Sequence, residues 1–326
     1  SGAGLLTNTG GGATVTLANG SSIDGLRIGG TGIGVSGIGV SNVAITNSII
    51  SGGAGAILLR DGGAVASATL TNLALSGTGG TVLVLLGTNG GALTAPGSGI
   101  SFGATGNARG LAMDSVALGA NLGFTTVSTL TSAGAGVSLN NVGGSGELSF
   151  ASIDVGGTSA GAGISLGGNS AAINLGTVIV ANTAGDGVEI LGNTGNVALG
   201  TFAISGATAT GLRVEGMQGA FTALGGSIIG GATGLSLTDI GGSATFTGGV
   251  ALAKPGGTGG RLGGGGTGTI GFGDVDITGL GANATGLDAR NASGNITFAT
   301  LDITGASAIG TRGIDLTGAT FGSNLV

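Results

Sequence analysis

Three aspartates near the C-terminal end of the sequence have the spacing that calcium binding or acid–base chemistry needs. Asp276 and Asp302 each stand four residues after a phenylalanine, Phe272 and Phe298, in two copies of one alternating phrase, and Asp274 precedes Asp276 by two residues. If the two copies stack as neighbouring strands, Asp276 and Asp302 lie about 5 Å apart. Like charges at this distance raise one pKa or recruit a cation. Asp274, Asp276 and Asp302 are therefore our candidate Ca²⁺ site, and we expect no other cofactor.

The same aspartates are the candidate acids of a polysaccharide lyase or hydrolase, because glycoside hydrolysis needs two carboxylates about 5–9.5 Å apart. A lyase would also need a basic residue, and Arg290 and Arg312 are the nearest in sequence. The alternative is a solvated outer face that keeps a sheet soluble and blocks edge pairing. We favour this alternative, so we expect the chain not to be an enzyme and assign no catalytic residue.

Other charged residues also fall in matching positions of a repeat. Glu189 and Arg213 share a slot one repeat apart, which predicts an exposed cross-strand ion pair. Asp288 and Asp315 form a second stacked pair, each two residues after a glycine that opens a repeat. Arg290 shares a face with Asp288, which fits an ion pair as well as a site.

The composition excludes several classes of protein. Only 7% of the 326 residues are charged, against about 25% in an average domain. Eight Lys+Arg and a net charge of −6 leave no basic face for phosphates, so we expect no nucleic-acid partner. No apolar run approaches the ~20 residues of a membrane helix, so we expect no membrane-spanning segment. Hydrophobic residues reach 41% and are placed periodically, which argues against disorder.

A glycine followed by an apolar residue opens a phrase that returns about every 26 residues. Eleven steps lead from Gly25 to Gly313, with degenerate copies at "TVLVLL" (81 onward) and "RLGGGG" (261 onward). The clear copies begin at Gly25, Gly55, Gly110, Gly136, Gly163, Gly187, Gly211, Gly234, Gly286 and Gly313. A repeat of this length indicates a solenoid.

A second, alternating phrase in each repeat has the periodicity of strands. Its first apolar slot holds Ile45, Leu70, Phe102, Phe124, Phe150, Leu175, Leu199, Leu224, Phe246, Phe272, Phe298 and Phe321. A later slot holds Leu75, Val155, Val180, Ile204, Ile229, Ile277 and Ile303. We predict an all-β parallel solenoid of about 12 coils, in which identical slots stack as interior ladders. Glycine recurs because corners need positive φ and because small residues let the chain turn tightly.

Three segments carry a resemblance to a known family: "TVTLANGSSIDGLRI", "VSNVAITNSIISG" and "ATLTNLALSG". They resemble right-handed parallel β-helix repeats of the pectin-lyase-like superfamily. The Gly/Ala/Thr-rich, cysteine-free style is most similar to bacterial autotransporter passengers and filamentous-haemagglutinin-like adhesins. Polygalacturonase-like members carry an Asp-Asp pair and a Gly-His-Gly, and this chain has neither.

The resemblance implies one right-handed β-helix domain over residues 1–326, part of a longer chain or open-ended at its C-terminus. We expect a non-catalytic structural or adhesive protein, secreted or on the surface of a bacterium, as a passenger, stalk or fibre subunit. Its partner would be a host or surface glycan or protein. The second expectation is a filament subunit that stacks end to end on copies of itself.

Overall fold

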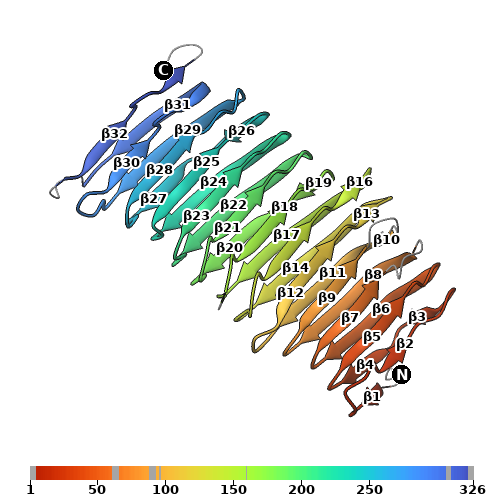
Figure 1. The fold of residues 1–326 in the computed structure, drawn as a ribbon. Helices are drawn as coiled ribbons and strands as arrows, with labels where there is room; N and C mark the ends of the chain where they lie inside the picture. The colour runs from red at the N-terminus through yellow and green to blue at the C-terminus, as the bar shows by residue number, and fades with distance from the viewer. Residues whose placement is uncertain are drawn as a thin grey trace. The chain divides into compact units, whose positions relative to one another are not determined.

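The computed structural model describes residues 5–60, 66–87, 93–94, 97–158, 160–305 and 310–321. The chain divides into two units, which we call unit 1 (Ser1–Ser159 with Asn169–Asn174) and unit 2 (Ala160–Gly168 with Leu175–Val326). Within each unit, successive turns of parallel strands lie side by side (Figure 1), and the described residues include no helix. Each unit is therefore an all-β parallel solenoid.

Every turn contributes strands to two sheets, which we call sheet A and sheet B. In unit 1, sheet B contains β2 (Val15–Thr16), β5 (Ile33–Ile38), β7 (Gly55–Arg60), β9 (Thr81–Leu86), β12 (Arg109–Asp114) and β15 (Val137–Asn140). Sheet A there contains β1 (Leu5–Asn8), β3 (Ser22–Asp24), β4 (Arg27–Gly30), β6 (Val43–Gly52), β8 (Ala66–Gly77), β10 (Leu93–Thr94), β11 (Gly97–Ala104), β14 (Leu122–Thr129), β17 (Glu147–Val155) and β19 (Ala172–Asn174). A small further pair joins β13 (Ala117–Leu118) to β16 (Gly143–Gly144).

Unit 2 repeats the same plan. Its sheet B strands are β18 (Ile164–Gly167), β21 (Val188–Leu191), β23 (Thr210–Glu215), β25 (Thr233–Thr238), β28 (Thr258–Gly263), β30 (Thr285–Asp288) and β32 (Arg312–Asp315). Its sheet A strands are β20 (Thr177–Ala181), β22 (Val197–Ser205), β24 (Ala220–Ile229), β26 (Ser243–Phe246), β27 (Val250–Ala253), β29 (Thr269–Thr278), β31 (Ser293–Ile303) and β33 (Thr320–Phe321).

The repeat length confirms the predicted architecture. In sheet B of unit 2, Ile164 and Ile314 are joined by six register steps, which average about 25 residues each. The chain makes about 12 turns in all. The right-handed sense of the coil stays a prediction.

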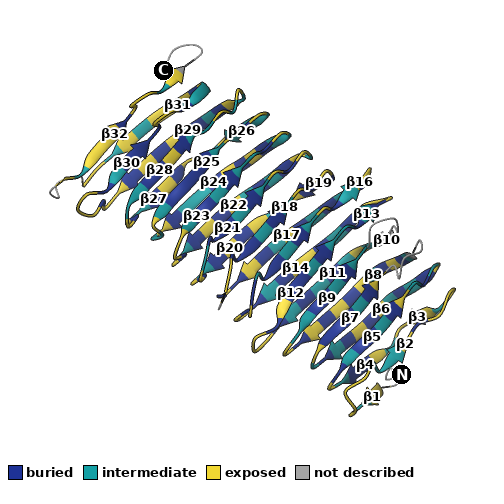
Figure 2. Cartoon of the chain, viewed as in Figure 1, coloured by how far each residue is buried: buried dark blue, intermediate teal, exposed yellow. Residues whose placement is uncertain are grey.

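Interior ladders of like side chains form the core, as the sequence predicted. In unit 2, Phe246, Phe272 and Phe298 stack in turn, with ring centroids 5.0 and 4.9 Å apart. In unit 1, Phe124 and Phe150 stack at 5.0 Å. Buried and exposed residues alternate along the strands (Figure 2), which is the pattern of a strand with one face on a core.

Two predicted ladder members are wrong by one residue. Leu224 is 60% exposed, and its neighbour Ala223 takes the interior slot between Leu199 and Phe246. Ile229 is likewise exposed, and Ile228 is buried in its place. The predicted slot assumes 25 residues from Leu199 to Leu224, whereas the turn from Leu199 to Ala223 has 24. A shift of one residue moves a side chain to the other face of a strand.

Two other positions of the repeats differ from the prediction. Phe102 is buried but pairs with Leu75 and Val127, because the register shifts around Ile100. Gly25 does not open the first glycine phrase: it lies at a corner before β4 with a φ of 65°, and β5 is the strand that pairs with β7. The side chain of Phe321 lies outside the described residues.

The glycine that opens each sheet B strand of unit 2 from β18 to β30 is required by close approach of the neighbouring turn, whereas Gly313 of β32 has open space around it. A Cβ on Gly211 would lie 2.2 Å from Cγ2 of Ile228 and 2.7 Å from the carbonyl oxygen of Gly234. A Cβ on Gly259 would likewise lie 2.5 Å from the carbonyl oxygen of Gly286. Positive φ explains other glycines, such as Gly206 at 65°, but not this column, so the predicted reason holds only at the corners.

The stacked rings predict where the solenoid is most sensitive to truncation. Phe246→Ala should lower the free energy of unfolding by about 3–5 kcal/mol, because Phe246 is fully buried between two other rings. Leu224→Ala, on the neighbouring turn and exposed, should change it by less than about 0.5 kcal/mol. Urea unfolding followed by circular dichroism measures both. Equal losses in the two variants would contradict this ladder.

Candidate functional site

From β21 to β32, one outward slot of sheet B in unit 2 carries a polar or charged side chain on every turn. Its occupants are register partners in sequence along the sheet, from β21 to β32. They are Glu189, Arg213, Ser236, Arg261, Asp288 and Asp315. We call this set the polar column. In a chain with so few charges, it concentrates charge on one face of the solenoid.

Arg213 is the centre of the first cluster in this column. Its Nε donates to Oε2 of Glu215 at 2.9 Å, and its Nη2 also donates to that oxygen. Its Nη1 lies 3.7 Å from Oδ2 of the buried Asp186, whose Oδ1 accepts a hydrogen bond from the backbone N–H of Thr210 at 2.8 Å. The hydrogen bond to Glu215 is the largest cause that raises the pKa of Arg213 above its ordinary value.

The predicted Glu189–Arg213 ion pair is not formed, although the predicted register is correct. The two residues are direct partners on β21 and β23, but Arg213 binds Glu215 and Asp186 instead. Glu189 accepts a hydrogen bond from Oγ of Ser165 at 2.6 Å, on the turn before. Glu215 lies two residues after Arg213 on the same strand, so its carboxylate reaches the guanidinium along the face.

A second cluster alternates arginine and aspartate along the last turns of the column. Arg290 donates from Nε and Nη2 to the two oxygens of Asp288, at 2.9 and 2.8 Å, which confirms this ion pair. Arg312 donates from Nη1 to Oδ2 of Asp315 at 2.9 Å. Nε of Arg290 lies 3.9 Å from the same oxygen of Asp315, which links the two pairs. The bidentate contact between Arg290 and Asp288 belongs to the stronger class of ion pairs in proteins.

Both aspartates of this cluster are held as anions. The side-chain hydrogen bond from Arg290 is the main reason that the pKa of Asp288 lies below its ordinary value, against the opposing effect of burial. The pKa of Asp315 is also lowered, first by hydrogen bonds from Thr317 and then by Arg312. Carboxylates with lowered pKa values do not donate protons near neutral pH. They are suited to electrostatic contacts instead.

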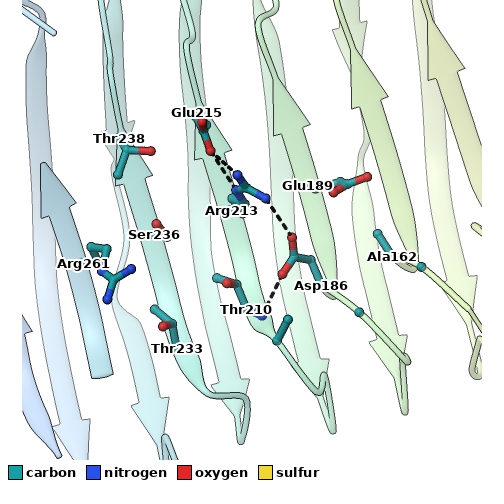
Figure 3. A pocket seen from close by; sticks show the side chains of 13 residues that line it. Ala162, Asp186, Glu189, Thr210, Arg213, Glu215, Thr233, Ser236, Thr238 and Arg261 are labelled. Carbon is teal, nitrogen blue, oxygen red and sulfur yellow. Dashed lines mark hydrogen bonds and ion pairs between the residues drawn. The ribbon is translucent and has the colours of Figure 1, made fainter. Parts of the chain in front are cut away.

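A pocket of about 480 Å³ opens over the first part of the polar column, within unit 2 (Figure 3). Arg261 lies toward one end of it and Glu189 toward the other, with Arg213 between them. The lining also includes the hydroxyl groups of Thr210, Thr233, Ser236 and Thr238. A smaller hollow of about 230 Å³ shares Thr238 and Arg261 and extends to Asp288, Arg290 and Asn291. The pocket is polar, so it suits a hydrophilic ligand.

The aspartates predicted from the sequence lie elsewhere, on the outer face of sheet A. Asp276 on β29 and Asp302 on β31 are direct register partners, as predicted, and both are exposed. Asp274 faces Thr300, whose Oγ1 donates to its Oδ1 at 2.8 Å. Across the ranges that the structure describes, no three such ligands are grouped to hold a metal ion. The calcium prediction gains no support from this arrangement and stays a prediction.

Asp186, Ser236 and Arg261 are functional candidates that the sequence reasoning missed. The degenerate repeat was placed at Arg261, but its glycine is Gly259, which lies against Gly286 of the next turn. With this alignment, Arg261 stands two residues after its glycine and pairs with Asp288. A search for polar residues two positions after every repeat glycine would have found the whole column.

The ion pairs of the second cluster predict an acid-sensitive contribution to stability. The folded pKa of Asp288 is depressed, so its contribution is complete above the unfolded pKa of about 3.9 and is lost as the pH falls through the folded value. Asp288→Asn should lower the free energy of unfolding by about 1–3 kcal/mol at pH 7. The difference from the wild type should shrink below about pH 4. Unfolding curves across pH test this, with the exposed Asp154→Asn as the control.

No family model, curated protein or solved structure matches this chain. The described ranges contain no helix with the length and apolarity needed to cross a membrane. What the chain does must therefore be argued from the solenoid and from its polar column.

Proposed function

We propose that the chain is a structural and adhesive protein of a bacterial surface, in the manner of an autotransporter passenger, stalk or fibre subunit, and not an enzyme. The observation that carries this proposal is the continuous stacking of turns on identical slots. Each turn satisfies its backbone and its apolar face with the neighbouring turns, which is a way to build a stiff body that can be extended. Such a body would bind a glycan or a protein, either of a host or of another surface.

The electrostatics of the polar column favour binding over catalysis. A general acid needs a pKa near the operating pH, but the pKa values of Asp288 and Asp315 are shifted downward. Arg213 is held by two carboxylates, which makes it a fixed charge. Fixed charges and open hydroxyl groups recognise a polar partner without converting it.

Location outside the cytoplasm fits the composition. The chain has no cysteine, so an oxidising compartment would neither help nor damage its fold. Together with the resemblance to surface adhesins, this supports a secreted or cell-surface protein.

Self-assembly is a second candidate, favoured by the exposed apolar residues of the terminal turns. Ile314 on β32 is 47% exposed, whereas Leu287, its partner in the same interior column, is 4% exposed. Leu316 is exposed beside it, as are Leu5 and Leu6 on the first strand of unit 1. A further turn stacked on either of these surfaces would bury apolar area. A second copy of the chain could supply that turn.

Adhesion and turnover can be measured on the same material. Beads carrying the purified chain should adhere to some of a panel of glycan- and protein-coated surfaces under flow, and should release no saccharide product from the glycans. The variant with Asp276→Asn and Asp302→Asn should adhere like the wild type. Product release by the wild type that disappears in this variant would replace our proposal with the lyase or hydrolase alternative.

Stacking of copies predicts sedimentation that depends on concentration. The sedimentation coefficient of the wild type should rise with concentration, and Ile314→Asp should abolish the rise, because a charge cannot be buried in the stacked core. Ile179→Asp is a matched control, since Ile179 is equally exposed at 47% but lies on the side of sheet A. A coefficient that stays constant in the wild type would eliminate the filament candidate.

A further inference from the structure

We infer that the pocket over β21 to β28 binds a small hydroxylated organic anion, with the anionic group on Arg261 and the hydroxyl groups over Ser236 and its neighbours. The inference rests on the proposed function in one respect, that the chain binds its ligand without converting it. It adds the site and the chemical class of the ligand.

Arg261 is the arginine of the pocket whose hydrogen-bonding capacity is unused. Its single ion pair within the described residues joins Nε to Oδ2 of Asp288 at 3.7 Å, and its guanidinium hydrogen-bonds to none of them. Both oxygens of Asp288 already accept hydrogen bonds from Arg290. The Arg261 side chain is 49% exposed, so its donors can be reached from the solvent. A guanidinium presents five N–H donors in a fork that matches carboxylate, sulfate and phosphate groups.

The second cluster contains one more positive than negative charge, and the excess lies at Arg261. From Arg261 to Arg312 the linked ion pairs contain three arginines and two aspartates, Asp288 and Asp315. Each aspartate has a closer arginine partner than Arg261, Arg290 for Asp288 and Arg312 for Asp315. The positive charge that remains is therefore located at the Arg261 end of the pocket, where an anion would neutralise it.

Hydroxyl groups in the pocket are also available to a ligand. Oγ of Ser236 and the Oγ1 atoms of Thr210, Thr233 and Thr238 hydrogen-bond to none of the described residues. Threonines elsewhere behave differently: Oγ1 of Thr208, for example, donates to the carbonyl oxygen of Ala184 at 2.7 Å on the turn before. A hydroxyl group can donate and accept, which suits the hydroxyl groups of a polyol.

The far end of the pocket limits how many anionic groups the ligand can carry. Asp186, Glu189 and Glu215 lie there around Arg213, and three carboxylates outnumber this one guanidinium. Arg213 and Arg261 stand two turns apart on the sheet, which is about 9–10 Å of backbone. A second anionic group at this distance would meet the carboxylates. The geometry therefore selects a ligand with one charged end and a neutral, hydroxylated remainder.

Gluconate and sorbitol are a matched pair of probes, since they share a hydroxylated six-carbon chain and differ in one carboxylate. Tryptophan and tyrosine are absent, so intrinsic fluorescence is weak and NMR is the better readout. The chain has only seven arginines, so each Nε–H signal can be assigned by substituting one arginine at a time. Gluconate should shift the Arg261 signal in a saturable way, and sorbitol should not.

The variants separate the anion contact from the hydroxyl contacts. Arg261→Gln should weaken gluconate binding by at least about tenfold, measured on the backbone signals of Ser236. Ser236→Ala should weaken it by a smaller factor. Arg60→Gln, which removes an exposed arginine of unit 1, should leave it unchanged. Thermal unfolding by circular dichroism verifies that each variant is folded.

Each remaining outcome has one meaning. Gluconate binding that survives Arg261→Gln, or sorbitol binding of equal strength, overturns the inference. Inorganic sulfate that binds Arg261 as tightly as gluconate overturns the part that concerns the hydroxyl groups. Conversion of gluconate to another product would overturn the proposed non-catalytic function and would leave the binding site in place.

Discussion

The structure depends on one constraint, that each turn must place its backbone in hydrogen-bonding register with the next. Parallel register between turns forces equivalent side chains into one column, so every choice of residue is made for a whole column. Inside the solenoid this produces the stack of Phe246, Phe272 and Phe298. Outside, the same constraint lines up charges that are 23 to 27 residues apart in the sequence, and it turns a few scattered residues into a continuous polar surface.

The polar column shows how a chain with few charges can use them efficiently. Register alone would bring Asp288 and Asp315 into repulsive contact, since they are direct partners. The arginines two or three residues away on the same turns, Arg290 and Arg312, bind these carboxylates and remove the repulsion. Because the second cluster contains three arginines and two aspartates, one guanidinium, that of Arg261, is left without a close partner. The excess positive charge of the second cluster therefore lies beside the pocket, at Arg261.

Much of the fold could be predicted from the sequence, because the turns of a solenoid appear in the sequence as a repeat of regular length. The parallel architecture, the interior phenylalanines and the partnership of Asp276 with Asp302 all follow from repeat spacing. The errors at Leu224 and Ile229 arose because the predicted slots assume 25 residues from the preceding turn, whereas the register step has 24, and period alone does not reveal the exact length of one turn. The site was harder to predict. Arg213 binds Glu215 and not its register partner Glu189, and this pairing depends on how far the side chains reach along one strand.

The glycine column of sheet B has a consequence for how such a chain can change over time. A side chain on Gly211 would collide with the carbonyl oxygen of the turn above and with Ile228 of its own turn, so no compensating change at one neighbour relieves both contacts. A single substitution is therefore not tolerated from Gly163 to Gly286 in this column. Duplication of a complete turn is tolerated, because the copy carries its own glycine and its own ladder residues. Natural variation in this protein should accordingly consist of gained or lost whole coils, with the corners absorbing small differences in length.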